Sequence, residues 1–174
     1  MKKLLTLLLC VAMLFAFAAC GAEQAPVEQP VETPAEIVGL AADEEVILTF
    51  EGASVEQMTM GEFKALPMQE VELSRTNSKG ETVVGVYTGV LWTDFAAAIG
   101  ASPESNIKII ASDDYQMAYT PAELNAEGSI FAIAKDGEAI SPADEAGKVW
   151  FCASESLTAN YWGKYIVKIV VEGE

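Results

Sequence analysis

Few side chains in this sequence could carry out chemistry. The 174 residues contain no histidine, a single arginine (Arg75) and three cysteines. Because no imidazole is available, Ser-His-Asp and Cys-His nucleophiles and histidine-rich zinc sites are excluded. Cys152 lies in the apolar run 149–153, which favours a buried structural thiol over a reactive one. We therefore predict no catalytic residue and no metal ligand from the residue types alone.

The other two cysteines fall within the first twenty residues. Lys2 and Lys3 precede an almost unbroken apolar stretch, 4–17, which small residues and then Cys20 follow. About 14 residues cover only about 21 Å of helix, whereas the hydrocarbon core of a bilayer is about 30 Å thick. The pattern therefore predicts a cleaved signal peptide, residues 1–19, rather than a permanent membrane span.

The cysteine at this boundary could accept a lipid. The segment Phe17-Ala18-Ala19-Cys20 resembles the lipobox of bacterial lipoproteins. This resemblance implies that Cys20 is lipidated and anchors the mature chain to the cell membrane on its extracytoplasmic side. The alternative is ordinary signal cleavage after Ala18, since residues 16–18 form an A-x-A pattern, which would release a soluble protein.

Residues 20–43 have the composition of a tether. From residue 21 to 43 there is no lysine or arginine, and Pro26, Pro30 and Pro34 are spaced four apart. Proline fixes φ and the glutamates repel one another, so we expect an extended, solvated segment without a core of its own. We therefore place the folded domain at residues 44–174.

The charge of the chain bears on its partners. Loss of Lys2 and Lys3 with the signal leaves eight of the ten basic residues against 26 acidic ones, a formal charge of about −18. Such a charge argues against binding nucleic acid or anionic lipid through a basic patch. The expected partners are the membrane, through the lipid, and an unknown small ligand or surface protein.

The remaining elements are mostly short strands. Two S/T-x-x-E capping boxes, at 59–62 and 120–123, predict short helices, as does the alanine-rich segment 93–99 that Gly100 follows. In the last strand we expect Tyr165, Val167, Ile169 and Val171 on one face, and elsewhere Val71, Leu73, Val149 and Phe151 buried. The pattern predicts an α+β domain dominated by antiparallel strands near 45–51, 70–76, 81–88, 106–112, 116–119, 130–135, 138–140, 149–153 and 164–172.

Four sequence segments in this order resemble the molybdopterin-binding domain of the sulfite oxidase family: Gly85–Val90 leading into Trp92–Phe95, Ala111–Tyr115, Phe131–Glu138 and Tyr161–Ile169. The resemblance covers about Val46 to Glu172 and implies a sulfite-oxidase-like fold. In the family, a cysteine thiolate that follows the strand matching 71–73 ligates molybdenum. Here Leu73-Ser74-Arg75 contains no cysteine, and hydroxyl or guanidinium groups do not replace a soft thiolate donor. We therefore expect no molybdenum cofactor, with molybdopterin binding as the alternative.

The resemblance also implies a ligand-binding cleft. A guanidinium is not buried unpaired, so we expect Arg75 to emerge into this cleft and to meet Asp113, Asp114 or an anionic ligand. The function that follows is a binding module without redox catalysis; the alternatives are a molybdopterin-dependent oxidoreductase and a structural or partner-binding subunit of a surface assembly. For each aromatic or charged candidate, packing or turn formation is the competing interpretation. The candidate residues are Arg75, Thr76, Asn77, Trp92, Asp113, Asp114, Tyr115, Tyr161, Trp162 and Lys164.

Overall fold

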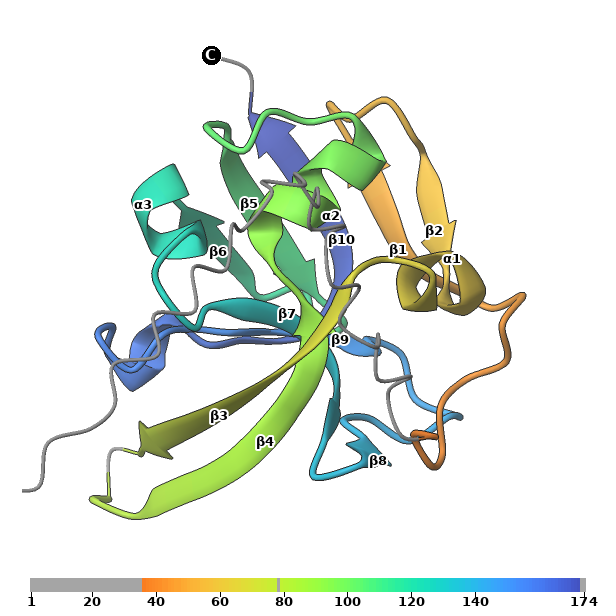
Figure 1. Ribbon diagram of the computed structural model, residues 1–174. Helices are drawn as coiled ribbons and strands as arrows, with labels where there is room; N and C mark the ends of the chain where they lie inside the picture. Colours follow the sequence, from red (N-terminus) through yellow and green to blue (C-terminus); the bar gives the residue numbers. More distant parts are fainter. Residues whose placement is uncertain (1–35, 78, 173–174) are drawn as a thin grey trace, which may run out of the picture. The chain divides into compact units, whose positions relative to one another are not determined.

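The computed structural model describes residues 36–77 and 79–172, and the account below is confined to them (Figure 1). The predicted signal peptide, the lipidation site Cys20 and most of the predicted tether lie outside these residues. In the described part of the chain, no helix combines the length and the apolar character that a bilayer-crossing segment requires.

Ten strands form one mixed sheet in which β1 (Val46–Glu51) runs parallel to β10 (Gly163–Glu172) and the other pairings are antiparallel. The main path through the sheet is β2-β1-β10-β9-β7-β4-β3, with β5 and β6 added beyond β10 and β8 beside β7. The predicted α+β class with many short strands is confirmed at this level. The other strands are β2 (Gln57–Thr59), β3 (Met68–Thr76), β4 (Thr82–Val90), β5 (Asn106–Ala111), β6 (Gln116–Tyr119), β7 (Ile130–Lys135), β8 (Glu138–Ala139) and β9 (Val149–Cys152).

The helices are short and begin where the capping boxes predict. Thr59 and Glu62 cap α1 (Met60–Lys64), and Thr120 and Glu123 cap α3 (Pro121–Leu124), each glutamate accepting the cap residue's N–H at 2.7 Å. The third helix, α2 (Trp92–Ile99), ends at Gly100, whose φ of 69° suits glycine best. A 3₁₀ turn, Ala159–Tyr161, precedes β10.

The core consists of aromatic rings held between α2 and the sheet. Phe95 of α2 lies 5.0 Å from Phe131 of β7, which lies 5.1 Å from Phe151 of β9, measured between ring centroids. All three side chains are fully buried. Gly89 of β4 permits this packing, because a Cβ there would collide with the backbone of Phe131. From this body the β3–β4 hairpin extends as a long arm (Figure 1).

The folded domain begins earlier than the predicted boundary at residue 44. Val38 forms a parallel bridge to Glu138 of β8, donating and accepting backbone hydrogen bonds with the β7–β8 hairpin, and Ala41 is buried. Ile37 and Leu40 pack against the core. The tether therefore does not extend to residue 43, because the domain covers the apolar side chains of Ile37, Leu40 and Ala41.

The last strand differs from its predicted pattern at one point. Tyr165 adopts a positive φ of 54° and is exposed, while Ile166 is fully buried. This irregularity shifts the pairing of β10 with β9 between Gly163 and Ile166, so Tyr165 leaves the face that alternation assigned to it. Beyond the bulge the pattern resumes, with Ile169 and Val171 buried and Val167 half-buried. Leu73, Val149 and Phe151 are buried as predicted, and Val71 is half-buried.

Candidate functional site

Arg75 is the penultimate residue of β3, near the end of the arm and opposite Val83 of β4. The strand ends after Thr76, whose hydroxyl lies 2.8 Å from that of Thr82. Asn77 then opens the turn, because its side-chain oxygen accepts the N–H groups of two turn residues. Thr76 and Asn77 thus close the hairpin, and Arg75 is the residue of this segment that turns toward the domain.

The guanidinium of Arg75 lies against an indole ring. Its Cζ is 5.7 Å from the ring centroid of Trp162, and the ring of Tyr87 meets the same indole edge-on at 5.2 Å. Trp162 is only 8% exposed. The Nε of Arg75 is buried and has no protein acceptor within hydrogen-bond distance. An aromatic ring, rather than the expected carboxylate, therefore receives the guanidinium of Arg75.

A polar cavity of about 320 Å³ opens beside this pair. Glu155 contributes a carboxylate to the lining of this cavity. This carboxylate accepts the Ser74 N–H at 2.7 Å, and so it holds the loop that contains Glu155 to the edge strand β3. The lining residues are Ser74, Arg75, Thr76, Glu155, Leu157, Thr158, Ala159 and Trp162.

The predicted pairing of Arg75 with Asp113 or Asp114 is wrong. Asp113 accepts the Tyr115 N–H at 3.1 Å, and Asp114 has a positive φ of 65° in the turn between β5 and β6. Among residues 36–77 and 79–172, no carboxylate oxygen lies within 4.0 Å of an Arg75 nitrogen. These aspartates therefore shape a turn, which is the competing interpretation for this pair of residues.

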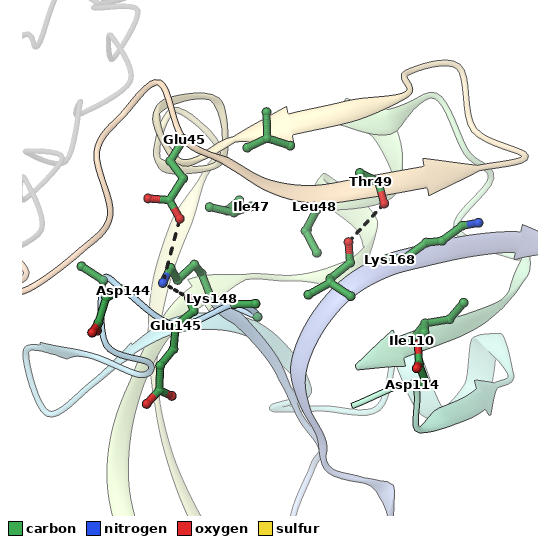
Figure 2. Close-up of a pocket in the computed structure, with 15 residues that line it drawn as sticks. Glu45, Ile47, Leu48, Thr49, Ile110, Asp114, Asp144, Glu145, Lys148 and Lys168 are labelled. Atoms are coloured by element: carbon green, nitrogen blue, oxygen red, sulfur yellow. Dashed lines mark hydrogen bonds and ion pairs between the residues drawn. The ribbon is translucent and has the colours of Figure 1, made fainter. Parts of the chain in front are cut away.

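Asp114 faces a different and larger groove, of about 660 Å³, between β1, β10 and the loop 143–148 (Figure 2). Figure 2 shows Glu45, Glu145 and Lys148 at one side of this groove and Lys168 and Asp114 at the other. Lys148 is buried and its ammonium donates to the carbonyl oxygens of Pro142, at 2.6 Å, and of Glu145. Lys168 pairs with Glu51 at 2.7 Å. The cations of this groove are thus satisfied by the protein itself.

Lys164 follows Trp162 by two residues, at the start of β10, and lies outside the lining of the Arg75 cavity. Its ammonium lies 4.5 Å from the ring centroid of Trp150, whose indole N–H is buried without a protein acceptor. Burial, and after it the positive charge of Arg75, lowers the pKa of Lys164 below its usual range. A third cation, Lys135, lies 6.0 Å from the ring of Tyr87 and pairs with Asp136 at 3.3 Å. We call these residues the cation–aromatic cluster: Arg75, Tyr87, Lys135, Trp150, Trp162 and Lys164.

The Cys152 thiol and the Tyr87 hydroxyl beside the cations are unreactive. Cys152 is fully buried, and burial raises the pKa of its thiol despite the nearby charges of Lys164 and Arg75. Burial likewise raises the pKa of Tyr87 to about 12. Both groups are therefore neutral at physiological pH, and neither balances the positive charge in front of them.

Several predicted site residues do not join the cluster. Trp92 is buried and its indole N–H donates to the Pro103 carbonyl at 3.0 Å, so it is a core residue. The carbonyl oxygen of Tyr161 accepts the Tyr119 hydroxyl at 2.9 Å. Tyr115 is exposed. Packing thus explains Trp92 and Tyr161, whose side chain is partly buried against the core, whereas Arg75 lies over Trp162 and Lys164 lies over Trp150.

Trp150 and Tyr87 are site residues that the sequence interpretation missed. The apolar run 149–153 predicts a buried strand, but Trp150 is half-buried and lies on the opposite face of β9 from Phe151. Period-two alternation within that run was the signal that could have found it.

The residues present do not fit a molybdenum centre. Arg75 occupies the position that the family resemblance assigns to the metal-binding cysteine, and the buried thiol of Cys152 has a raised pKa. No group of three or more histidine, cysteine, aspartate or glutamate side chains gathers within the described part of the chain in a way that could hold a metal ion. A high-valent metal would therefore lack its soft thiolate donor here.

Comparison with known proteins places the fold but not the function. No family model matches the chain, and no curated protein matches it. Among solved structures, the domain is similar to a chain of the sulfane dehydrogenase SoxCD from Paracoccus pantotrophus, with a TM-score of 0.57 and 12% sequence identity. The match covers 79% of this chain and 40% of that chain, so this chain spans well under half the length of its neighbour. The similarity supports the predicted fold type and extends to the fold alone.

Proposed function

We propose that this domain is a binding module that takes a small anion in the cavity at Arg75 and performs no redox catalysis. The observation that carries the proposal is the state of Arg75. The single arginine of the chain is stacked on Trp162, lines a polar cavity and has no carboxylate partner among the described residues.

The acidity of the chain makes this state informative. With 26 acidic residues in the chain, four of the seven lysines in the described segments lie within 4.0 Å of a carboxylate. Arg75 does not, although its five N–H donors match the oxygens of carboxylates, phosphates and sulfates. What distinguishes Arg75 from the unpaired lysines is its buried Nε beside a polar cavity, which leaves its donors available to an external anion.

The cellular setting is part of the proposal. The cysteine at the end of the signal-like segment supports a lipid anchor on Cys20 that holds the domain on the extracytoplasmic side of the cell membrane. Cys20→Ser should leave unprocessed precursor or released protein, and inhibition of lipoprotein processing should do the same. Membrane-bound Cys20→Ser protein of the mature size would contradict the anchor.

The binding proposal is tested by calorimetric titration with small anions at low ionic strength. Charge-assisted hydrogen bonds contribute about 1.5–3 kcal/mol, so Arg75→Gln should weaken the best anion by about 10- to 100-fold. Lys168→Gln is the matched control, because Lys168 pairs with Glu51 outside the cavity, and it should leave the affinity unchanged. Equal affinity in wild type and Arg75→Gln would refute the proposal.

A second measurement addresses catalysis. Protein purified from its native host should contain no stoichiometric molybdenum or pterin, and adding molybdopterin should not raise its melting temperature. A pterin–metal complex seated at Arg75, with turnover of a substrate, would instead establish the oxidoreductase that is the alternative function.

A further inference from the structure

The cation–aromatic cluster contains a second cation that the Arg75 cavity alone does not explain. Trp162 and Lys164 are two residues apart, so alternation places their side chains on one side of the chain, with Cα atoms about 7 Å apart. Arg75 stacks on Trp162, and Lys164 stacks on the neighbouring Trp150. Each cation is therefore fixed over a tryptophan at this end of the sheet, and the positive charge of Arg75 contributes, after burial, to the lowered pKa of Lys164.

The protein does not neutralise this pair. In the described segments, neither Arg75 nor Lys164 has a carboxylate oxygen within 4.0 Å. The nearby carboxylates are committed elsewhere, since Glu155 accepts the Ser74 N–H and Asp136 accepts the Val86 N–H at 2.8 Å while pairing with Lys135.

The hydrogen-bonding groups of the cluster are also incomplete. Across residues 36–77 and 79–172, two buried side-chain donors lack a protein acceptor, and they are Arg75 Nε and the indole nitrogen of Trp150. One donor belongs to each stacked pair: Arg75 Nε to the pair with Trp162, and the Trp150 indole nitrogen to the pair with Lys164. Unpaired buried donors and unpaired like charges both destabilise a fold, and their coincidence at one place indicates a ligand rather than packing.

We propose that Arg75 and Lys164 together bind a doubly charged anion, each cation facing one of its negative charges. This inference rests on the proposed function, names the ligand class for the Arg75 site and adds to it Lys164, which lies outside the residues that line the cavity. A monoanion would leave one cation uncompensated, whereas a dianion neutralises both and removes their mutual repulsion. The aromatic rings on which the cations are stacked hold them in place, so little side-chain freedom is lost on binding.

The test compares anions of similar shape and different charge. Sulfate is paired with methanesulfonate, and succinate with butyrate, in calorimetric titrations at one fixed, low ionic strength. Wild type should bind the dianion of at least one pair at least about tenfold more tightly than its monoanion, because the second negative charge meets the second cation. The sulfate pair represents inorganic oxyanions and the succinate pair organic dicarboxylates, so the preferred pair identifies the source.

Variants separate this inference from the proposed function. Lys164→Gln should remove the preference for the dianion and leave monoanion affinity nearly unchanged, while Arg75→Gln should weaken both. Lys168→Gln should behave as wild type. If Lys164→Gln keeps the full dianion preference, the two-cation site is wrong although anion binding at Arg75 stands. If wild type binds none of the four probes, both proposals fail.

Proton uptake gives a readout that a merely structural lysine would not produce. A bound dianion should raise the pKa of Lys164, so titrations near pH 9 should show a binding heat that depends on the ionisation enthalpy of the buffer. Lys164→Gln should abolish this dependence. A buffer-independent heat in wild type would contradict a direct contact between Lys164 and the anion.

Discussion

Arg75→Met should make the unliganded domain more stable, not less. The substitution removes a cation–π contact at 5.7 Å, worth about 0.5–1 kcal/mol. It also removes a buried Nε that lacks an acceptor, an arrangement that costs about 1–3 kcal/mol. Methionine keeps an apolar stem against Trp162, so little packing is lost. The balance favours Arg75→Met by about 1 kcal/mol in the free energy of unfolding, and relief of the repulsion on Lys164 acts in the same direction.

Urea unfolding followed by far-ultraviolet circular dichroism measures this change. With a denaturant dependence of about 1–3 kcal/mol per molar, the midpoint should rise by about 0.3–1 M. Lys168→Met is the matched control on β10 and should shift stability by less than about 1 kcal/mol, because it loses an exposed pair with Glu51. A loss of more than about 1 kcal/mol in Arg75→Met would show that the guanidinium is required by the fold, and the reasoning that assigns it to a ligand would fail.

Three further predictions concern the fold and its titration. A chain that begins at residue 36 should match the stability of the mature protein in urea unfolding. A chain that begins at residue 44 should lose about 2–4 kcal/mol, because Leu40 and Ala41 no longer cover the core. Equal stabilities of the two chains would contradict the revised boundary. In the chain from residue 36, Cys152 should react with a thiol reagent only after unfolding, since it is fully buried; rapid labelling of the native state would show that the strand opens. The pKa of Lys164 is lowered in the folded state, whereas in the unfolded state it has the usual value of about 10.4. Between these two pKa values the unfolded state binds more protons, so the free energy of unfolding should rise with pH. Urea unfolding between pH 8 and 10 should show a smaller rise in Lys164→Gln than in wild type, and identical slopes would refute the pKa argument.

Much of the fold could be predicted because its signals are local. The capping boxes at Thr59 and Thr120 place two helices, and Asp136-Gly137, with φ of 53° and 81°, forms the tight turn between the predicted strands 130–135 and 138–140. Local signals do not report what a segment packs against. The composition of residues 20–43 therefore predicts a tether that includes Leu40, although Leu40 packs against the core. The prolines that indicate the tether all lie before Leu40.

The sequence likewise predicted some features of the candidate site and not others. The residue types in the sequence were enough to exclude imidazole chemistry, to single out Arg75 as the arginine and to predict that it emerges from the end of β3, because a buried guanidinium needs a partner. The identity of that partner depended on the pairing of distant strands. The bulge at Tyr165 and the short 3₁₀ turn before β10 set where Trp162 and Lys164 lie, and β9 brings Trp150 beneath Lys164. Sequence spacing carries no information on such contacts between strands, so the tertiary structure alone decided that two tryptophans, and not two aspartates, receive the cations.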